Sequence, residues 1–263
     1  MNIEIYYFSG TGNSLKIAKD LSVKLGNCQL LPIAKFLQTD LLKSTSKKIG
    51  FIFPLYYSGL PKIVYDFVNK INLEKSDYIF TVITSAGDIN EFPLQQLKQI
   101  LETKSKILNA GFFITMPNNY IIGFDIHSKE HQKELFKRAI KKVEKISEIV
   151  KKEEVNLKND IFRKHLTRSE KVNNTFRMEV NESDKSFYVE DSCTSCGICE
   201  KVCPVNNISL VKGKPIWQHR CQLCLACINF CPEKSIQFGG ETLKTGRYHH
   251  PEITIQEIIN QKS

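Results

Sequence analysis

Eight of the nine cysteines in this chain fall into two runs with identical spacing. Each run reads C-x2-C-x2-C-x3-C-P, and the second repeats the first 28 residues later. The eight are Cys193, Cys196, Cys199, Cys203, Cys221, Cys224, Cys227 and Cys231. Thiolates are soft metal ligands that suit iron–sulfur clusters and zinc. Because free structural thiols have no reason to repeat in register, the pattern predicts metal chemistry.

The same spacing is the ligand pattern of bacterial ferredoxins, in which the fourth cysteine of each run binds the cluster of the other run. We therefore expect two [4Fe–4S] clusters. The first is assigned to Cys193, Cys196, Cys199 and Cys231. The second is assigned to Cys203, Cys221, Cys224 and Cys227. Zinc is an alternative, but it requires neither the third cysteine of a run nor the C-P ending. Disulfides require an oxidising compartment, and no signal peptide is visible.

A second candidate site follows the first apolar run of the chain. Residues Ile3 to Phe8 have the pattern of a buried parallel strand, and an amphipathic helical pattern begins six residues later. The connecting loop is Ser9, Gly10, Thr11, Gly12, Asn13 and Ser14. Backbone N–H groups, hydroxyl groups and the positive end of a helix bind phosphate in such a loop.

This loop is neither G-x-x-x-x-G-K-[ST] nor G-x-G-x-x-G, which disfavours a nucleoside triphosphate or a dinucleotide. It resembles the phosphate loop of flavodoxins, and the resemblance implies that Ser9, Thr11, Gly12, Asn13 and Ser14 hold the phosphate of FMN. A helix capped by Ser, Thr or Asn, with no ligand, is the alternative.

Further strand patterns alternate with helical patterns along the first half of the chain. The strands are expected at Lys48–Phe53, Asp77–Thr84 and Phe112–Thr115, and the helices near Lys62–Asn69, Phe92–Thr103 and Lys129–Val150. This alternation predicts an α/β fold with a doubly wound parallel sheet. The flavodoxin-like strand order is 2-1-3-4-5, and ligands of such sheets bind beyond the carboxyl ends of the strands.

The loops at those strand ends supply candidate contacts for an isoalloxazine ring. They are Pro54, Leu55, Tyr56, Tyr57, Ser58, Gly59, Ser85, Ala86, Gly87, Asp88 and Tyr120. We expect Tyr56 or Tyr57 to stack on the ring and Tyr120 to cover its far side. Backbone amides at Gly59 and Gly87 are expected to reach the N5 and O4 edge. Alternatively, the tyrosines are placed by packing alone.

Composition is that of an ordinary soluble protein, with 41% hydrophobic and 25% charged residues in 263. No apolar run approaches the roughly 20 residues that span a bilayer, so no membrane span and a cytoplasmic location are expected. The formal net charge is +9. Two clusters with their thiolates would lower it by about 4 and a flavin phosphate by up to about 2, which disfavours nucleic-acid binding.

The chain is long enough for one medium and one small domain. We expect a flavodoxin-like FMN-binding domain over residues 1–152 and a smaller α+β bacterial ferredoxin-like domain over 188–240. Residues 153–187 contain Leu157, Ile161, Phe162, Leu166 and Phe176, too many apolar residues for a free tether. Short helices packed between the domains are expected there. Residues 241–263 form a C-terminal extension.

The order of these parts resembles the EFR1-type flavodoxin–ferredoxin fusion proteins of anaerobic bacteria and archaea. The matching pieces are YYFSGTGNS (6–14), FPLYYSGLPKIV (53–64), CTSCGICEKVCPVNNI (193–208), HRCQLCLACINFCPEKSI (219–236) and GRYHHPEI (246–253). The resemblance implies FMN in the first domain and two [4Fe–4S] clusters in the second, without a named substrate. It assigns no role to GRYHHPEI.

Both motif sets on one chain favour an electron carrier that passes electrons between FMN, two clusters and external redox partner proteins, because flavin chemistry links electron pairs to single electrons. The alternative is a ferredoxin-dependent flavin reductase acting on a small organic substrate under Tyr57, Ser85 and Tyr120. A redox sensor or a structural cluster module is a third possibility. No Ser/His/Asp set, carboxylate pair or nicotinamide fingerprint is present.

Overall fold

The computed structural model describes residues 3–37, 39, 42–87, 90–157 and 166–262. Its central element is a five-stranded parallel sheet in the order β2-β1-β3-β4-β5. The strands are β1 (Ile3–Tyr7), β2 (Cys28–Pro32), β3 (Lys48–Pro54), β4 (Tyr78–Ser85) and β5 (Ala110–Thr115). This order is the flavodoxin-like 2-1-3-4-5 topology, so the fold predicted from the alternating patterns is confirmed.

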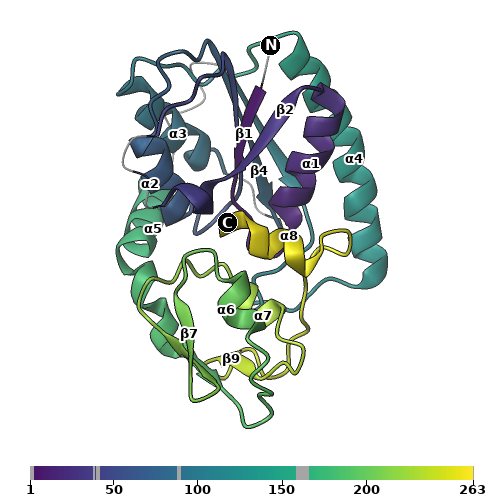
Figure 1. Cartoon of the computed structure of the whole chain (residues 1–263). Coiled ribbons are helices and arrows are strands. Elements are labelled where there is room, and N and C mark those ends of the chain that lie inside the picture. Colours follow the sequence, from purple (N-terminus) through teal and green to yellow (C-terminus); the bar gives the residue numbers. More distant parts are fainter. Residues whose placement is uncertain (1–2, 38, 40–41, 88–89, 158–165, 263) are drawn as a thin grey trace.

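Helices cover both faces of the sheet (Figure 1). The helices α1 (Asn13–Leu25) and α4 (Lys129–Lys151) pack on one face, and α2 (Lys62–Lys70) and α3 (Phe92–Glu102) pack on the other. Alternate side chains of β1 therefore enter two different cores: Ile5 joins the core under α1, and Tyr6 joins the core under α2. Because both faces are covered, every residue of β1 is buried.

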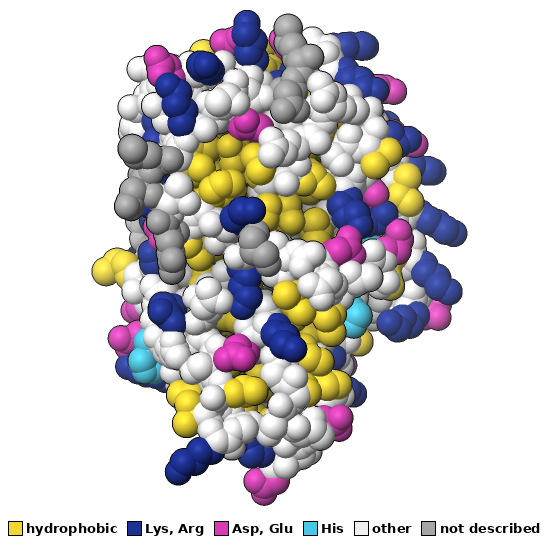
Figure 2. Space-filling view, in the orientation of Figure 1, with side chains coloured by type: hydrophobic (Ala, Val, Ile, Leu, Met, Phe, Trp, Pro, Cys, Tyr) yellow, Lys and Arg dark blue, Asp and Glu magenta, His cyan; other side chains and the backbone are white. Residues whose placement is uncertain are grey.

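The outer face of α4 carries an exposed stripe of basic side chains along one edge of the molecule (Figure 2). The exposed lysines of this helix include Lys133, Lys137, Lys141, Lys142 and Lys145. The opposite face of the helix buries Leu135, Ala139 and Val143 against the sheet. The periodicity of the sequence therefore separates a solvated face from a packed face.

A smaller unit lies beyond the carboxyl edge of the sheet (Figure 1). It contains two antiparallel strand pairs, β6 (Phe187–Val189) with β9 (Ile236–Phe238) and β7 (Ile208–Val211) with β8 (Lys214–Trp217). Two short helices, α6 (Ile198–Val202) and α7 (Ala226–Asn229), carry cysteines of the two runs. This is the predicted smaller α+β unit, and its apolar core includes Leu223, Leu225 and Ile228.

Among the described residues between the two units, the structure has the helix α5 (Leu166–Glu179) and the 3₁₀ helix η3 (Val180–Ser186). Ile161 and Phe162, which the sequence placed in short helices between the domains, lie outside the described residues. Asn173 of α5 is fully buried and donates to the carbonyls of Tyr56 (3.0 Å) and Leu60 (3.2 Å). Its Oδ1 accepts from Gln96 at 2.9 Å, so one amide fixes α5 against the sheet unit.

The last part of the chain returns to the sheet unit as α8 (Ile255–Ile259) and the 3₁₀ helix η4 (Asn260–Lys262). Figure 1 shows this segment between the sheet and the smaller unit, next to the start of α1. A capping box of Thr254 and Glu257 begins α8. Within the described ranges, no helix is both long and apolar enough to cross a membrane.

Candidate functional site

The loop between β1 and α1 has the geometry of an anion site. Gly12 is the N-cap of α1, with φ of +100°, and no side chain caps the helix. Within the part of the chain that the structure describes, the N–H groups of Thr11, Asn13 and Ser14 find no acceptor. Buried, unpaired amides at a helix N-terminus attract an anion. The alternative of a helix closed by a Ser, Thr or Asn cap does not describe this loop.

The loop hydroxyls are held in place by neighbouring groups. Ser9 Oγ accepts from the N–H of Gly12 at 3.1 Å, and Thr11 Oγ1 accepts from Asn119 Nδ2 at 2.7 Å. Ser14 Oγ lies 2.8 Å from Thr84 Oγ1. A hydroxyl that accepts a hydrogen bond still has a hydrogen to donate. Ser9 and Thr11 are therefore oriented, and both retain a donor for a phosphate.

A cavity of about 540 Å³ opens beyond the carboxyl ends of the strands. This is within the usual size range of cofactor sites. Eleven predicted residues line it: Ser9, Asn13, Ser14, Pro54, Leu55, Tyr56, Tyr57, Ser85, Ala86, Gly87 and Tyr120. Four others, Thr11, Gly12, Ser58 and Gly59, do not reach the cavity wall, and Asp88 lies outside the described residues.

Other parts of the wall were not among the predicted contacts. One is the loop after β5, where Met116, Pro117, Asn118 and Asn119 line the cavity. The rule that ligands bind at strand ends places this loop at the site, but only Tyr120 of it was predicted as a contact. Another is Leu223, Cys224 and Leu225, which come from the smaller unit. No local signal places those residues beside the sheet.

The two tyrosines of the β3 loop line the cavity but also pack against α5. The ring of Tyr57 stacks on Phe176, with centroids 4.4 Å apart and an angle of 8°, while Tyr56 meets the same ring edge-on. The hydroxyls of Tyr57 and Tyr120 lie 2.7 Å apart. Burial raises the pKa of Tyr120, and the hydrogen bond to Tyr57 raises it further. Tyr120 is therefore a neutral phenol with a proton to donate at physiological pH.

The turn that carries Tyr57 is strained. Tyr57 and Ser58 have φ of 46° and 67°, and the flanking residues Tyr56 and Gly59 exchange backbone hydrogen bonds of 3.0 and 2.9 Å. Two consecutive positive φ angles define a type I′ turn, which usually contains Gly or Asn. Such strain is stored most often at functional sites.

The expected role of Gly59 at the edge of a flavin needs correction. Its N–H donates to the carbonyl of Tyr56 within the turn and is not free. A Cβ at this position would lie 2.4 Å from Cγ of Asn173. The glycine is therefore required by the packing of α5. At Gly87, in contrast, a Cβ would meet nothing within 4 Å among the described residues.

The eight run cysteines group as two crossed sets. Burial raises the pKa of Cys199 to about 11, the N–H of Glu200 opposes this rise, and the charges of Cys196, Cys231 and Cys193 add to it. Burial likewise raises the pKa of Cys224, and the nearby thiols of Cys203 and Cys221 add to the rise. Each fourth cysteine thus lies with the other run, as the ferredoxin pattern implies. Cys227 interacts with the second set and also with Cys199, so the two sets are adjacent.

Backbone amides point at the sulfur atoms. The N–H of Asn207 donates to Cys203 Sγ and that of Leu223 to Cys221 Sγ, both at 3.2 Å. Such bonds stabilise negative charge on the sulfurs and tune a bound cluster. Among the described residues, no three His, Cys, Asp or Glu side chains converge closely enough for a single metal ion.

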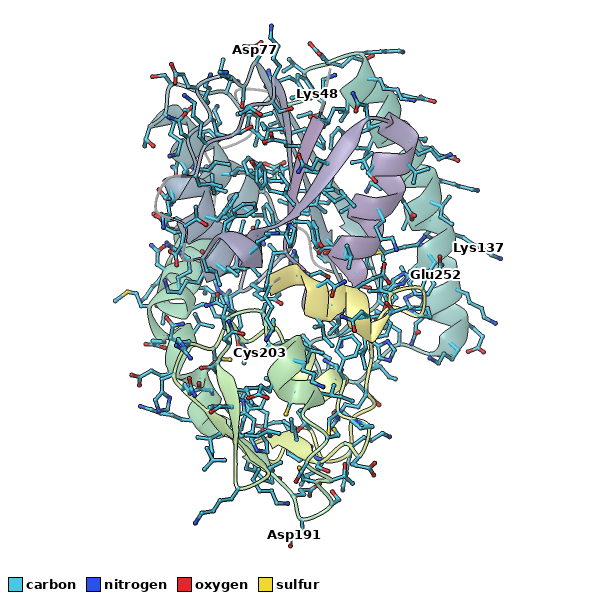
Figure 3. All side chains as sticks on the ribbon, in the orientation of Figure 1. Lys48, Asp77, Lys137, Asp191, Cys203 and Glu252 are labelled. Atoms are coloured by element: carbon cyan, nitrogen blue, oxygen red, sulfur yellow. The ribbon has the colours of Figure 1, made fainter. Side chains whose placement is uncertain are left out.

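The cavity and the second thiol set share a wall. Cys224 lines the cavity, and a Cβ on Gly10 would lie only 2.3 Å from the carbonyl oxygen of Cys224. The phosphate loop and the cysteine loop therefore touch, backbone against backbone. In Figure 3, Cys203 marks the end of the smaller unit nearest the sheet, and Asp191, two residues before Cys193, marks its far end. The second set faces the cavity, and the first run begins at the outer end.

His250 packs behind the phosphate loop, where it is 1% exposed and its backbone N–H donates to the Thr11 carbonyl at 2.8 Å. Burial lowers the pKa of His250 to about 4; Glu252 opposes the shift, and Lys16 and His249 reinforce it. The unfolded chain, with a pKa near 6.5, binds the proton more readily. Stability from neutral His250 is therefore complete above about pH 6.5 and is lost as the pH falls toward 4.

Replacing His250→Phe should reduce the loss of stability on acidification. Between pH 7 and pH 5 we expect the variant to lose about 2 kcal/mol less unfolding free energy than the natural protein. Anaerobic chemical denaturation at the two pH values measures this difference. Ile140→Phe, on the exposed surface of α4, introduces the same side chain without removing a titratable group; it is the control and should retain the natural pH dependence. Equal losses in all three proteins would contradict the burial of a neutral imidazole.

Comparisons with known proteins bear on both units. Residues 192–236, which contain all eight run cysteines, match the family model described as a 4Fe-4S dicluster domain. One component of an ion-translocating oxidoreductase complex from Methanosarcina acetivorans is 36% identical over 70 residues, which are 26% of this chain and 26% of that protein. The two-electron reduced flavodoxin of Megasphaera elsdenii is 18% identical, with a TM-score of 0.32, over 53% of this chain and 98% of that one. The chain thus joins a flavodoxin-like sheet unit, identified by its strand order, to a unit of the 4Fe–4S dicluster type.

Proposed function

We propose that this protein is an electron-transfer iron–sulfur flavoprotein, with FMN in the 540 Å³ cavity and two [4Fe–4S] clusters on the crossed thiol sets. The observation that carries the proposal is the shared wall, where Cys224 lines the cavity and its carbonyl contacts Gly10. A cofactor in the cavity and a cluster on the second set are then neighbours without intervening protein layers. Residues 1–152 and 188–240 are the two functional units, as in EFR1-type fusion proteins.

In this proposal the residues of the chain bind and orient the cofactors and keep water away from them. The free N–H groups of Asn13 and Ser14, two residues of the cavity wall, bind the phosphate, and Tyr56, Tyr57 and Tyr120 bound the ring. The amides of Asn207 and Leu223 stabilise sulfur charge. The apolar core of the smaller unit keeps water away from the thiol sets. When bound, FMN exchanges electrons in pairs or singly, and each cluster exchanges one.

Exposure of the thiols orders the route to a partner. Cys196 of the first set is exposed, whereas the four cysteines of the second set are buried or half-buried; Cys199 of the first set is also buried. We therefore infer that electrons pass between the cavity and the second thiol set, then between the second and first sets, and finally between the first set and an external protein. The acceptor or donor docks near Cys196 and exchanges single electrons. We further propose a location in a reducing cytoplasm, because the eight cysteines that hold the clusters must not be oxidised to disulfides.

Anaerobic purification with cluster reconstitution tests the proposal. We expect one FMN and about eight irons per chain, with an electron paramagnetic resonance signal for each cluster during reductive titration. Protein that retains neither flavin nor iron after reconstitution would reject it. Four irons with a full complement of FMN would reject the two-cluster part alone.

A second function is favoured by the hydroxyl pair of Tyr57 and Tyr120, which lies at the cavity with a neutral, proton-donating phenol. In that case the protein is a ferredoxin-dependent reductase of a small organic substrate, and the pair supplies a proton to it. Rapid oxidation of the reduced protein by one small molecule, without a protein acceptor, would support this function. Loss of that turnover in Tyr120→Phe would assign the proton donor.

A further inference from the structure

The C-terminal clamp, defined here as Tyr248, His250, Ile253 and Gln261, holds the backbone of the phosphate loop at two points. The first is the bond from the N–H of His250 to the Thr11 carbonyl, at 2.8 Å. The second is Gln261, whose Oε1 accepts from the N–H of Ser9 at 3.2 Å and whose Nε2 donates to the Ser9 carbonyl at 3.0 Å. Gln261 is 1% exposed, so its amide pairs with the loop much as a neighbouring strand would.

The clamp also connects the phosphate loop to the cysteine-binding unit. Tyr248 OH donates to Asn13 Oδ1 at 2.7 Å, and the N–H of Tyr248 donates to Asn229 Oδ1 at 2.9 Å. Asn229 ends α7, the helix that contains Cys227, and Asn13 begins α1. Asn13, Tyr248 and Asn229 are only 7%, 2% and 3% exposed, respectively. They form one buried relay between the two candidate cofactor sites.

The clamp leaves the phosphate loop no room to relax. A Cβ on Gly12 would lie 3.0 Å from both His250 Cβ and Ile253 Cβ. Asn13, oriented by Tyr248, donates to the Pro117 carbonyl at 2.9 Å. At the surface, Lys16 of α1 pairs with Glu252 at 2.9 Å, and Figure 3 shows Glu252 in the loop before α8. The N–H groups that converge on a phosphate are thus supported from outside by residues more than 230 positions away in sequence.

We propose that Tyr248 and Gln261 are positioning residues that preorganise the phosphate loop for FMN, and that the relay through Asn229 couples FMN affinity to assembly of the cluster-binding unit. This inference rests on the proposed function, because it assigns FMN to the cavity. Preorganisation raises affinity because the loop does not have to be ordered when the ligand binds. The coupling is reciprocal, so bound FMN in turn stabilises the contacts between the clamp and the phosphate loop.

Titration of FMN into flavin-depleted protein with both clusters in place tests the inference, with flavin fluorescence as the readout. Tyr248→Phe removes one hydroxyl and should raise the FMN dissociation constant about three- to tenfold. Gln261→Glu replaces the donor to Ser9 with a carboxylate beside the anion site and should raise it about tenfold or more. The reduction potential of bound FMN is the second readout, and both variants should shift it.

Two matched variants serve as controls. Tyr78→Phe also removes a buried tyrosine hydroxyl, one that donates to the Glu154 carbonyl at 2.9 Å at the other end of the sheet. Gln256→Glu makes the same charge change on the exposed side of α8. Both should bind FMN within twofold of the natural protein, even if Tyr78→Phe is less stable.

The outcomes separate this inference from the proposed function. If Tyr248→Phe, with full iron content, binds FMN within twofold of the natural protein and with the same potential, the positioning role is wrong. If Gln261→Glu fails to hold its clusters, the FMN affinity and reduction potential of Tyr248→Phe alone decide whether the positioning role is right. If the natural protein itself binds no FMN, the proposed function fails instead.

Discussion

Cys203→Ser is expected to remove the cluster that faces the cavity, although Cys203 belongs to the first cysteine run. The reason is the crossed grouping, in which Cys203 lies with Cys221 and Cys224 while Cys231 lies with Cys199. The iron content should fall from about eight to about four per chain. Because the remaining cluster is the outer one, rapid electron exchange between FMN and iron should also be lost.

Cys231→Ser makes the complementary prediction. It should also leave about four irons, but the surviving cluster is the one beside the cavity, so FMN still exchanges electrons with it. Stopped-flow absorbance after reduction of the flavin distinguishes the two variants. Cys28→Ser is the control: Cys28 lies on β2, and its thiol contacts the Gly26 carbonyl, so both clusters should remain. If Cys203→Ser kept rapid exchange and Cys231→Ser lost it, the crossed grouping would be wrong.

Gly10→Ala is expected to push apart the phosphate loop and the cysteine loop. The added Cβ would lie 2.3 Å from the carbonyl oxygen of Cys224. Because this neighbour is a backbone atom and not the end of a flexible side chain, the clash is relieved only if one of the two loops moves. Overpacking of this kind costs about 1–3 kcal/mol, or roughly 2–10 °C in Tm for a chain of this size. The larger separation should also slow electron exchange between FMN and the neighbouring cluster.

Anaerobic thermal unfolding and stopped-flow exchange measure the two effects. Gly240→Ala is the matched control, because a Cβ there would meet no described atom within 4 Å and its φ is not positive. That variant should behave as the natural protein in both measurements. A Gly10→Ala protein with unchanged exchange and unchanged Tm would show that the two loops are not in contact in solution.

The features that could be predicted from the sequence are those whose residue pattern lies within one short stretch of the chain. The cysteine runs need only spacing, and the loop from Ser9 to Ser14 needs only a strand before it and a helix after it. The alternation of strand and helix patterns predicts a doubly wound parallel sheet, and the order 2-1-3-4-5 comes from the resemblance of the phosphate loop to that of flavodoxins. These features are local or follow general rules of topology.

The remaining features depend on contacts between distant segments. Phe176 covers Tyr57 because Asn173 fixes α5 to the sheet unit, and nothing in the sequence near either residue indicates this. The same is true of Gly59, which matches a flavin-edge glycine in pattern but serves the packing of Asn173. The segment GRYHHPEI carried no chemical signal because its Tyr and His act by hydrogen bonding to a loop at the other end of the chain.

The pairing of Ser9 with Gln261 has a consequence for biosynthesis. The two residues are 252 positions apart, so at about 5–20 residues per second the ribosome makes Gln261 roughly 10–50 s after Ser9. During that time the nascent flavodoxin-like sheet emerges with its anion-binding turn still open on one side. With FMN in the cavity as proposed, prosthetic-group loading is expected to follow synthesis of the C-terminal segment, and a translation product that ends before Gln261 is expected to lack the yellow chromophore.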